Sequence, residues 1–277
     1  MIPPRGVFSR SLPPGRFLVF GLLLAFLPFP PEMKASLPST ELVYVHDQAK
    51  TTPTAQFRQD SVGEAGGIHR GPASKRQVAL TFDACPSSSR GGYDEKIVQT
   101  LLETRTPATF FLSGRWAQKH PEETGFLARQ PDFAIGTHGF RHEQLSRRND
   151  REIAADLATG KRVLERMTRR RIILFRPPYA EADRRIVRVA DSLGLTTVLF
   201  DLASGDPDTA ITARRLADYV SSSARSGSIV IMHVNGRGWH TAEALPEIIR
   251  RLRQRGFTLV TVPALLGIRA STPLKSQ

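Results

Sequence analysis

Short apolar runs alternate with longer amphipathic segments along the chain from residue 77 onward. The short runs are rich in β-branched and aromatic residues, which is typical of buried strands. They predict seven strands, at 77–83, 108–113, 132–137, 172–176, 196–201, 228–233 and 258–262.

The segments between these runs have the apolar spacing of helices. In residues 150–167, for example, Ile153, Leu157 and Leu164 fall on one stripe of a helix. The pattern predicts helices at 94–104, 115–129, 150–167, 182–193, 211–224 and 242–254. Strands that alternate with helices are typical of a parallel sheet or barrel, so the predicted fold class is α/β. The functional site of such folds lies at the carboxyl ends of the strands.

The first 76 residues have a different texture. Residues 1–35 contain three arginines followed by an apolar run at 17–29, which is the pattern of a signal peptide with cleavage near Ala35. A membrane-spanning helix needs about 20 apolar residues, so we expect no stable membrane span after cleavage; an uncleaved anchor is the alternative. The expected location is periplasmic or secreted. Residues 36–76 are mostly polar and predict an irregular N-terminal extension.

The chain is strongly basic, with 39 Lys and Arg against 26 Asp and Glu and a formal net charge of +13. Arginine pairs such as those at 184–185 and 250–251 lie on polar sides of predicted helices, where solvated charge is ordinary. Because no zinc-finger or RNP-type signature accompanies them, we expect no nucleic-acid partner. The positive field favours encounters with anionic polymers or surfaces. A single cysteine, Cys85, excludes an intramolecular disulfide.

Titratable residues gather where the predicted strands end. These residues are Asp83, His138 with His142, Arg176 with Tyr179, Asp201 with Asp206, and His233. The opposite ends of the strands carry nothing comparable. Because the carboxyl ends of parallel strands meet at one edge, we expect these side chains to form an active site.

Two histidines of this set, His138 and His142, stand four residues apart in THGFRH. Two imidazoles on one turn can share a divalent metal at about 2.0–2.1 Å each. The metalloprotease version of this spacing has Glu directly after the first histidine, and the residue here is Gly139, which argues against that class. Two surface histidines near a turn are the alternative interpretation.

The remaining strand ends offer acid–base chemistry. Asp83 follows a buried strand, where a carboxylate is costly unless it is paired, and Arg176 is its natural partner. A purely structural ion pair is the alternative. His233 ends an apolar strand and could donate a proton near neutral pH, with Asp201 or Asp206 orienting its ring. A histidine satisfied within the core is the other interpretation of His233.

The ordered segments TFDAC, HGFRH, FRPPY, FDLASGD and IMH resemble the five sequence motifs of the polysaccharide deacetylases, the NodB-like carbohydrate esterases. ATFFLSGRWA and the closing TAEALPEIIRRLRQRGFTLVTV add to the similarity. The resemblance extends over residues 77–263, leaving 264–277 as a C-terminal tail. It implies a distorted (β/α)7 barrel with parallel strands, in agreement with the seven predicted strands.

The resemblance also implies an activity. Members of the family hydrolyse N-acetyl, and sometimes O-acetyl, groups of sugar polymers with a divalent metal, usually zinc. On this chain the metal would take His138 and His142, while Asp83, steadied by Arg176, would remove a proton from water. The Tyr179 backbone N–H would help to hold the oxyanion, and His233 would protonate the departing amine. The implied partner is an acetylated glycan whose identity the motifs do not specify.

One departure from the family pattern affects the expected metal site. The first motif usually has two successive aspartates, the second of which is a metal ligand, and here the second is Ala84. A catalytic zinc normally has three protein ligands, so Asp94 or Asp83 itself would have to replace the missing one. The alternative is a catalytically impaired deacetylase-like protein that binds saccharides or serves in envelope assembly.

Overall fold

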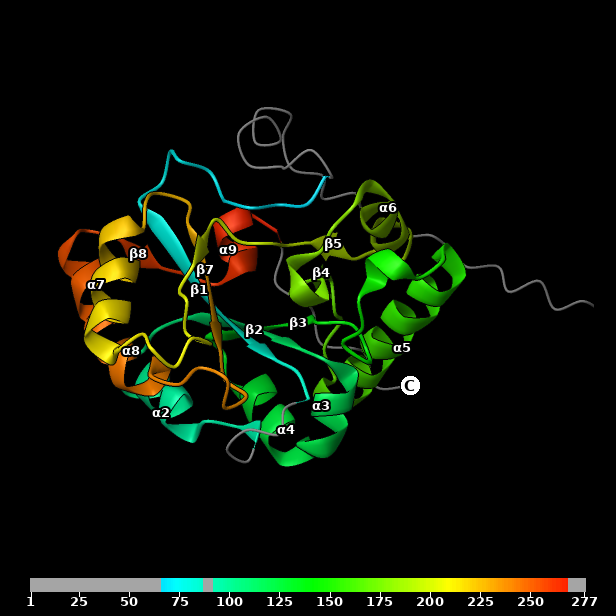
Figure 1. Ribbon diagram of the computed structural model, residues 1–277, viewed down its shortest axis with the longest axis horizontal. Helices are drawn as coiled ribbons and strands as arrows, with labels where there is room; N and C mark the ends of the chain where they lie inside the picture. The colour runs from blue at the N-terminus through cyan, green and yellow to red at the C-terminus, as the bar shows by residue number, and fades with distance from the viewer. Residues whose placement is uncertain (1–65, 87–91, 269–277) are drawn as a thin grey trace, which may run out of the picture. The chain divides into compact units, whose positions relative to one another are not determined.

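Parallel strands form one curled sheet at the centre of the computed structural model, which describes residues 66–86 and 92–268 (Figure 1). The strand order is β5-β4-β3-β2-β1-β7-β6, and β8 pairs with the first residues of β1. The strands are β1 (Gln77–Ala84), β2 (Ala108–Leu112), β3 (Phe133–Thr137), β4 (Leu174–Phe175), β5 (Thr196–Thr197), β6 (Leu202–Ala203), β7 (Ile229–His233) and β8 (Thr258–Leu259).

Helices surround the outer face of this sheet (Figure 1). They are α2 (Glu95–Glu103), α3 (Gly114–Lys119), α4 (Pro121–Arg129), α5 (Asp150–Thr168), α6 (Arg184–Ser192), α7 (Ala213–Ser223) and α8 (Thr241–Gln254). A last helix, α9 (Val262–Leu266), packs instead against the inward-facing side chains of the sheet. The predicted α/β class is therefore confirmed, with a distorted barrel of parallel strands. No helix within 66–86 and 92–268 is long and apolar enough to cross a membrane. The predicted signal peptide at 1–35 lies outside the described residues.

Several predicted elements were wrong in their extent, and the strands expected at 172–176 and 258–262 are only Leu174–Phe175 and Thr258–Leu259. The single helix expected at 115–129 is divided into α3 and α4, because Pro121 has no N–H to continue a helix and instead begins a new one. The strand expected at 196–201 ends at Thr197. Beyond it, the Val198 and Leu199 carbonyls accept hydrogen bonds from the Arg176 guanidinium, and Val198 forms only an isolated parallel bridge with Ile68.

Strand alternation sorts the side chains into two layers. On β1, Val78, Leu80 and Phe82 belong to the large core between the sheet and the helices. The alternate residues Ala79, Thr81 and Asp83 therefore face the inside of the barrel. The same period places the last residue of β7 and the residues that follow β3 and β4 on the inside at the carboxyl edge. Those residues are His233, His138 and Arg176.

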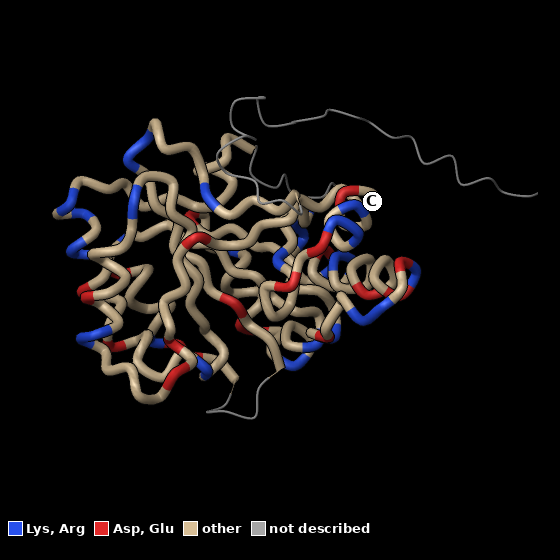
Figure 2. The backbone as a smooth tube through the Cα atoms, turned by 45° about the horizontal axis from the view of Figure 1, so that its top comes forward, with Lys and Arg blue, Asp and Glu red and all other residues tan. Residues whose placement is uncertain are grey.

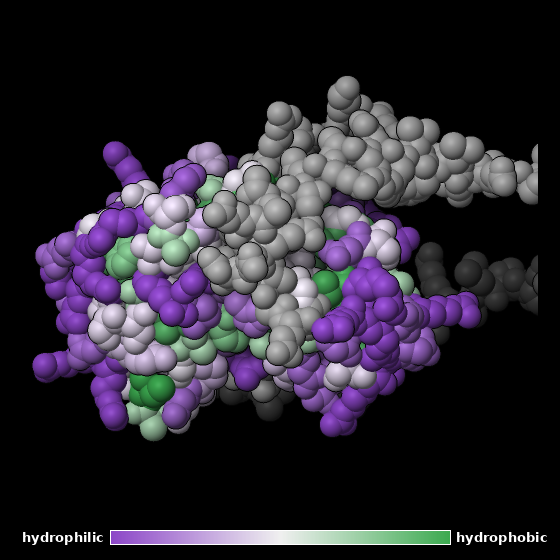
Figure 3. Space-filling model, turned by 90° about the horizontal axis from the view of Figure 1, so that it is seen from above, coloured by the Kyte–Doolittle hydropathy of each residue, from purple (hydrophilic) through white to green (hydrophobic). Residues whose placement is uncertain are grey.

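The amino end of the barrel is filled by a separate apolar cluster. It comprises Ile68, Ala79, Phe111, Leu174, Val198, Ile229, Val262, Leu265 and Leu266. Residues that precede the first strand and residues that follow the last strand both contribute to this cluster. Ile68, before β1, donates its N–H to the Thr197 carbonyl at 2.9 Å, and α9, after β8, supplies three members. In the face shown in Figure 3 the visible described surface is mostly hydrophilic, as expected for helices whose apolar sides cover the sheet.

A glycine on α5 sets how closely this helix approaches the turn after β3. A Cβ on Gly160 would lie 2.7 Å from the carbonyl carbon and oxygen of Gly139, and backbone cannot move aside as a side chain can. Gly160→Ala is expected to lower the free energy of unfolding by about 1–3 kcal/mol, which denaturant titration would measure. Gly125→Ala on α4 is the control, because its Cβ would meet only the flexible end of Arg129 and should stabilise the helix by up to about 1 kcal/mol. Equal effects of the two substitutions would contradict this account.

Candidate active site

The strand ends bring four predicted site residues together inside the barrel. Asp83 on β1 and His233 on β7 are direct register partners. His138 follows β3 and Arg176 follows β4, and these two strands are also paired. Asp83, His138 and Arg176 are 2%, 3% and 0% exposed, respectively. The expectation that these side chains meet at the carboxyl edge is therefore met in the geometry.

Arg176 holds Asp83 in place. Its Nη1 donates to the Asp83 Oδ1 at 2.8 Å and to the Thr81 hydroxyl at 2.7 Å. Its Nη2 donates to the Leu199 carbonyl at 2.9 Å, and its guanidinium carbon lies 4.1 Å from the centre of the Phe111 ring. A buried guanidinium with this many acceptors and an aromatic neighbour is compensated for its lost hydration.

The charge state of Asp83 follows from its neighbours. Burial alone would raise the pKa of Asp83, but the positive charge of Arg176, aided by His138 and His233 and by the Arg176 hydrogen bond, holds it below its ordinary value. The carboxylate is therefore ionised at neutral pH, the form that can accept a proton from water. A lowered pKa also means that this carboxylate contributes stability above its unfolded-state value and loses it as the pH falls through the folded-state value.

The ring of His138 is held as one tautomer. Its Nδ1 lies 2.7 Å from the Arg176 carbonyl oxygen, which can only accept a hydrogen bond, so Nδ1 carries the proton. Burial lowers the pKa of His138, so the ring is neutral and its Nε2 has a lone pair. That Nε2 lies 3.6 Å from the Asp83 Oδ2. Two acceptor atoms facing each other at this distance favour a hydrogen-bond donor or a cation between them.

His142 lies beside His138 on the turn after β3. The two ring centres are 4.8 Å apart, and the Tyr179 ring lies 4.7 Å from His142 on its other side. Burial and the neighbouring His138 lower the pKa of His142 to about 3. Both imidazoles are therefore neutral at neutral pH, as metal ligation requires.

The turn that carries these histidines is fixed by Asp156, which sequence reasoning missed. The Asp156 carboxylate accepts the Phe140 N–H at 2.8 Å and the Arg141 N–H at 3.1 Å. Gly139 has φ of 72°, and a Cβ there would lie 2.8 Å from the Asp156 Oδ2. The sequence could have indicated this role. Asp156 lies between Ile153 and Gly160 on the buried side of α5, where a carboxylate needs a specific partner.

The donor set does not match a three-ligand zinc site. Ala84 occupies the place of the expected ligand and belongs to the outer hydrophobic core. Asp94, one candidate replacement, caps α2 by accepting the Lys96 N–H at 3.1 Å. Within residues 66–86 and 92–268 no group of three His, Cys, Asp or Glu side chains is placed to hold one ion. The arrangement supplies two imidazoles and one ionised carboxylate, with Asp83 already bound to Arg176.

His233 is oriented by Asp206 and not by Asp201. The Asp206 Oδ1 lies 2.9 Å from the His233 Nδ1, and its Oδ2 accepts the His233 N–H at 2.7 Å and the Thr241 hydroxyl at 2.8 Å. Asp201 instead accepts the Ile229 N–H at 2.8 Å at the start of β7. The contribution of Thr241 had no sequence signal, because a threonine in the first turn of a helix is ordinary.

The electrostatics of His233 suit a proton donor. Burial lowers its pKa, but the hydrogen bond and charge of Asp206, together with the charge of Asp83, outweigh burial and raise the pKa above its ordinary value. Arg237 is another residue that sequence reasoning missed; it is exposed on the loop after β7, and its charge lowers the pKa of both His142 and His233.

Tyr179 lies at the edge of the site, next to His142, and its side chain is largely exposed. Its side chain is 57% exposed and its backbone has φ of 59°, an uncommon value for a residue with a side chain. The preceding Pro177 and Pro178 restrict the chain where it leaves β4. The ring contact with His142 places this turn next to the two histidines.

Comparison with known proteins identifies the domain. Residues 70–198 match the family described as polysaccharide deacetylase. This region of the chain, residues 70–198, is therefore a polysaccharide deacetylase domain. A peptidoglycan-N-acetylglucosamine deacetylase of Bacillus cereus is 29% identical over 200 residues, covering 70% of this chain and 90% of the relative. A chitooligosaccharide deacetylase of Azorhizobium caulinodans is 28% identical over 218 residues, covering 73% and 99%.

Solved structures similar to this chain include a pseudoenzyme and an active mutant of it. A pseudoenzyme of carbohydrate esterase family 4 from Bacillus anthracis has a TM-score of 0.66 and 25% identity, covering 74% of this chain and 70% of that one. A mutant of the same pseudoenzyme with restored enzymatic activity has a TM-score of 0.66 and 26% identity, covering 74% and 72%. The barrel therefore occurs in solved proteins with and without activity.

The Asp206–His233 pair yields a prediction for titration. Asp206→Asn removes the charge that favours the imidazolium, so the pKa of His233 should fall, as NMR titration of its ring protons would show. Because the pKa is raised in the folded protein, the pair contributes stability below the unfolded-state value of about 6.5 and loses it as the pH rises through the folded-state value. The variant should therefore lose stability mainly at acidic pH.

Asp201→Asn is the matched control for this titration, since Asp201 bonds to Arg225, Ser228 and Ile229 and not to His233. The control should leave the titration of His233 where it is in the parent protein. A His233 pKa that is unchanged by Asp206→Asn would contradict the assignment.

Proposed function

We propose that this domain removes acetyl groups from N-acetylated sugars of a polysaccharide or cell-wall glycan. The observation that carries the proposal is the juxtaposition of two supported acid–base groups: Asp83 with Arg176, and His233 with Asp206, at register partners of adjacent strands. Burying the Asp83–Arg176 ion pair is costly, and the position of this pair at the carboxyl ends of the strands favours a chemical role over a purely structural one. The names of the bacterial relatives support an acetylated glycan as substrate.

The proposed reaction is hydrolysis of the acetamide. Ionised Asp83 accepts a proton from water as the water oxygen bonds to the acetyl carbon. The Tyr179 backbone N–H donates to the oxygen that becomes negative. His233, protonated and held by Asp206, gives its proton to the sugar nitrogen as the carbon–nitrogen bond breaks. The products are acetic acid and a free sugar amine, and return of the proton from Asp83 to His233 through water restores both groups, so atoms and charge balance.

Metal dependence, general in this family, extends to this chain as part of the proposal. His138 and His142 offer two neutral imidazoles to a divalent cation such as Zn2+, whereas catalytic zinc ordinarily has three protein ligands. Such an ion, when bound, would supply Lewis-acid polarisation of the acetyl group. No step described above depends on it.

Export is also proposed. The support is the charge and apolar pattern of residues 1–35, typical of a signal peptide, and the location of wall glycans outside the cytoplasm. A periplasmic or secreted location would follow.

A second candidate function is favoured by Ala84. A domain that keeps the side chains at the strand ends but holds metal weakly could bind saccharides, or serve in envelope assembly, without turnover. The Bacillus anthracis pseudoenzyme shows that the same barrel can exist in an inactive form.

Acetate release from N-acetylglucosamine oligomers, with and without added Zn2+, separates the two functions. Release is expected from the parent protein, and Asp83→Asn should reduce it by about 100-fold or more because the proton acceptor is lost. Oligomer binding measured by calorimetry on both proteins is the control for correct folding. Binding without acetate release under any metal would leave only the second function.

The position of Ala84 yields a further prediction. Ala84 is fully buried in the outer core, so Ala84→Asp should lower the melting temperature of the metal-free protein by burying a carboxylate. Added Zn2+ should raise the melting temperature of this variant more than that of the parent, with affinity for Zn2+ roughly tenfold tighter or better. Ala84→Asn matches the size without the charge and should respond less. Equal zinc-induced shifts in all three proteins would show that residue 84 does not reach the ion.

A further inference from the structure

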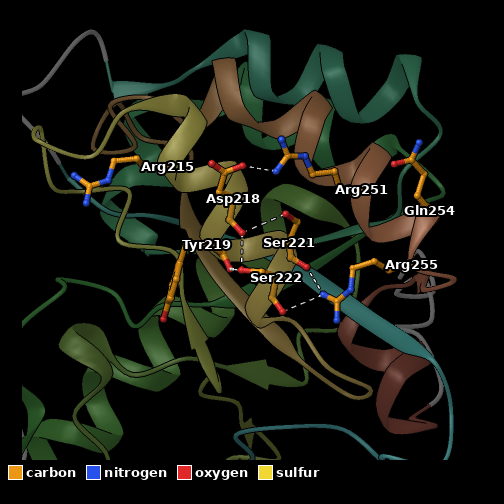
Figure 4. Close-up of a pocket in the computed structure, with 8 residues that line it drawn as sticks. All are labelled: Arg215, Asp218, Tyr219, Ser221, Ser222, Arg251, Gln254 and Arg255. Carbon is orange, nitrogen blue, oxygen red and sulfur yellow. Dashed lines mark hydrogen bonds and ion pairs between the residues drawn. The ribbon is translucent and has the colours of Figure 1, made fainter.

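A polar cleft lies on the outer surface where α7 and α8 pack side by side (Figure 4). It has a volume of about 750 Å³, within the range of ordinary ligand sites. The cleft is lined by residues of α7, including Arg215 and Tyr219, and by residues at the end of α8, including Arg251 and Arg255. Because α7 and α8 cover the outside of the sheet, this cleft is separate from the catalytic side chains inside the barrel.

The charge of the cleft is positive. Its lining contains three arginines and one acidic residue, Asp218. Asp218 is already paired with Arg251, which also bonds to Glu247. Among the described residues, neither Arg215 nor Arg255 forms an ion pair with an acidic side chain. Figure 2 shows Lys and Arg positions along the edge of the molecule that these two helices form.

One of these arginines is held in a fixed position. The Arg255 Nη1 donates to the Ser221 carbonyl and, at 3.3 Å, to the Ser222 carbonyl at the end of α7. The guanidinium carbon of Arg255 also lies 5.0 Å from the centre of the Phe257 ring. These contacts include no carboxylate, so no acidic side chain of the described region neutralises Arg255, and they remove much of the conformational entropy that would be lost on binding an anion.

The lining also includes an exposed aromatic ring, which projects away from Arg255 (Figure 4). Tyr219 is 50% exposed and lines the same cleft. An exposed, rigid ring provides a flat apolar surface at small entropic cost, suited to the carbon–hydrogen face of a sugar. Ser222 and Gln254 add hydrogen-bonding groups to the lining (Figure 4). The combination of cation, aromatic ring and hydroxyl or amide groups matches a sugar that carries an anionic substituent.

We infer that the cleft between α7 and α8 binds an acidic polysaccharide. Arg215 and Arg255 contact its carboxylate or phosphate oxygens, and Tyr219 packs against a sugar ring. The site goes beyond the proposed hydrolysis, because it lies on the outer helices and includes none of the side chains of the active site. It would retain the protein on an anionic glycan while the barrel acts elsewhere on the same or a neighbouring polymer.

The charge requirement can be tested with the full chain and polygalacturonate as probe. The double variant Arg215→Gln with Arg255→Gln should weaken binding about tenfold or more and make it less dependent on salt. Arg162→Gln with Arg166→Gln, which removes the same charge from exposed positions of α5, should change binding by less than about twofold. Acetate release should be unchanged in both. Equal losses in the two variants would show nonspecific attraction and overturn the proposal.

The sugar requirement is tested separately. Tyr219→Ala should weaken binding of polygalacturonate but not of polyphosphate, which has no sugar ring. An equal effect on both probes, no effect on either, or tighter binding of duplex DNA than of polygalacturonate at the same salt would overturn the proposal. Because Arg255 also contacts the end of α7, Arg215→Gln alone, checked by thermal melting, keeps the charge test valid if the double variant fails to fold.

Discussion

The buried ion pair of Arg176 with Asp83 is the interaction on which the rest of the barrel edge depends. One guanidinium connects the end of β1, through Asp83 and Thr81, to the chain beyond β5, through the Val198 and Leu199 carbonyls. Removing one member would leave an uncompensated charge in an apolar interior, which costs about 3–5 kcal/mol. The same residue also supports a carboxylate and, by its carbonyl, selects the tautomer of His138.

Much of the architecture was readable from the order of apolar segments, and so was the set of strand ends that carry the site. Residues on strands one to three positions apart in the sheet converged because side chains alternate along a strand and parallel strands end together. The features of the site that the sequence did not predict depend on contacts between segments that are distant along the chain. Asp201 and Asp206 stand five residues apart on either side of β6, and only the folded path of this segment decides which of them reaches His233. The position of Pro121 could have indicated the break between α3 and α4, but amphipathic spacing across it concealed the signal.

The site combines complete acid–base pairs with an incomplete ligand set. Asp206 and Arg176 each satisfy a partner that would otherwise be destabilised by burial, whereas the position of Ala84 offers only a methyl group to the core. This contrast explains why motif resemblance alone does not decide between turnover and binding. The proton-transfer groups and the groups that would hold an ion are separate sets of side chains, and a family member can lose one while it retains the other.

The apolar cluster at the amino end of the barrel has a consequence for access. Ile68 and the three α9 residues seal that end beneath Phe111, so solvent and any reactant must approach Asp83 from the opposite rim. The seal is assembled from the two extremities of the folded region, which lie nearly two hundred positions apart. A shortened chain that starts at 77 or stops before 262 would therefore lose part of the apolar cluster that closes the amino end of the barrel. Water could then reach Asp83 from that end, although every residue of the site was still present.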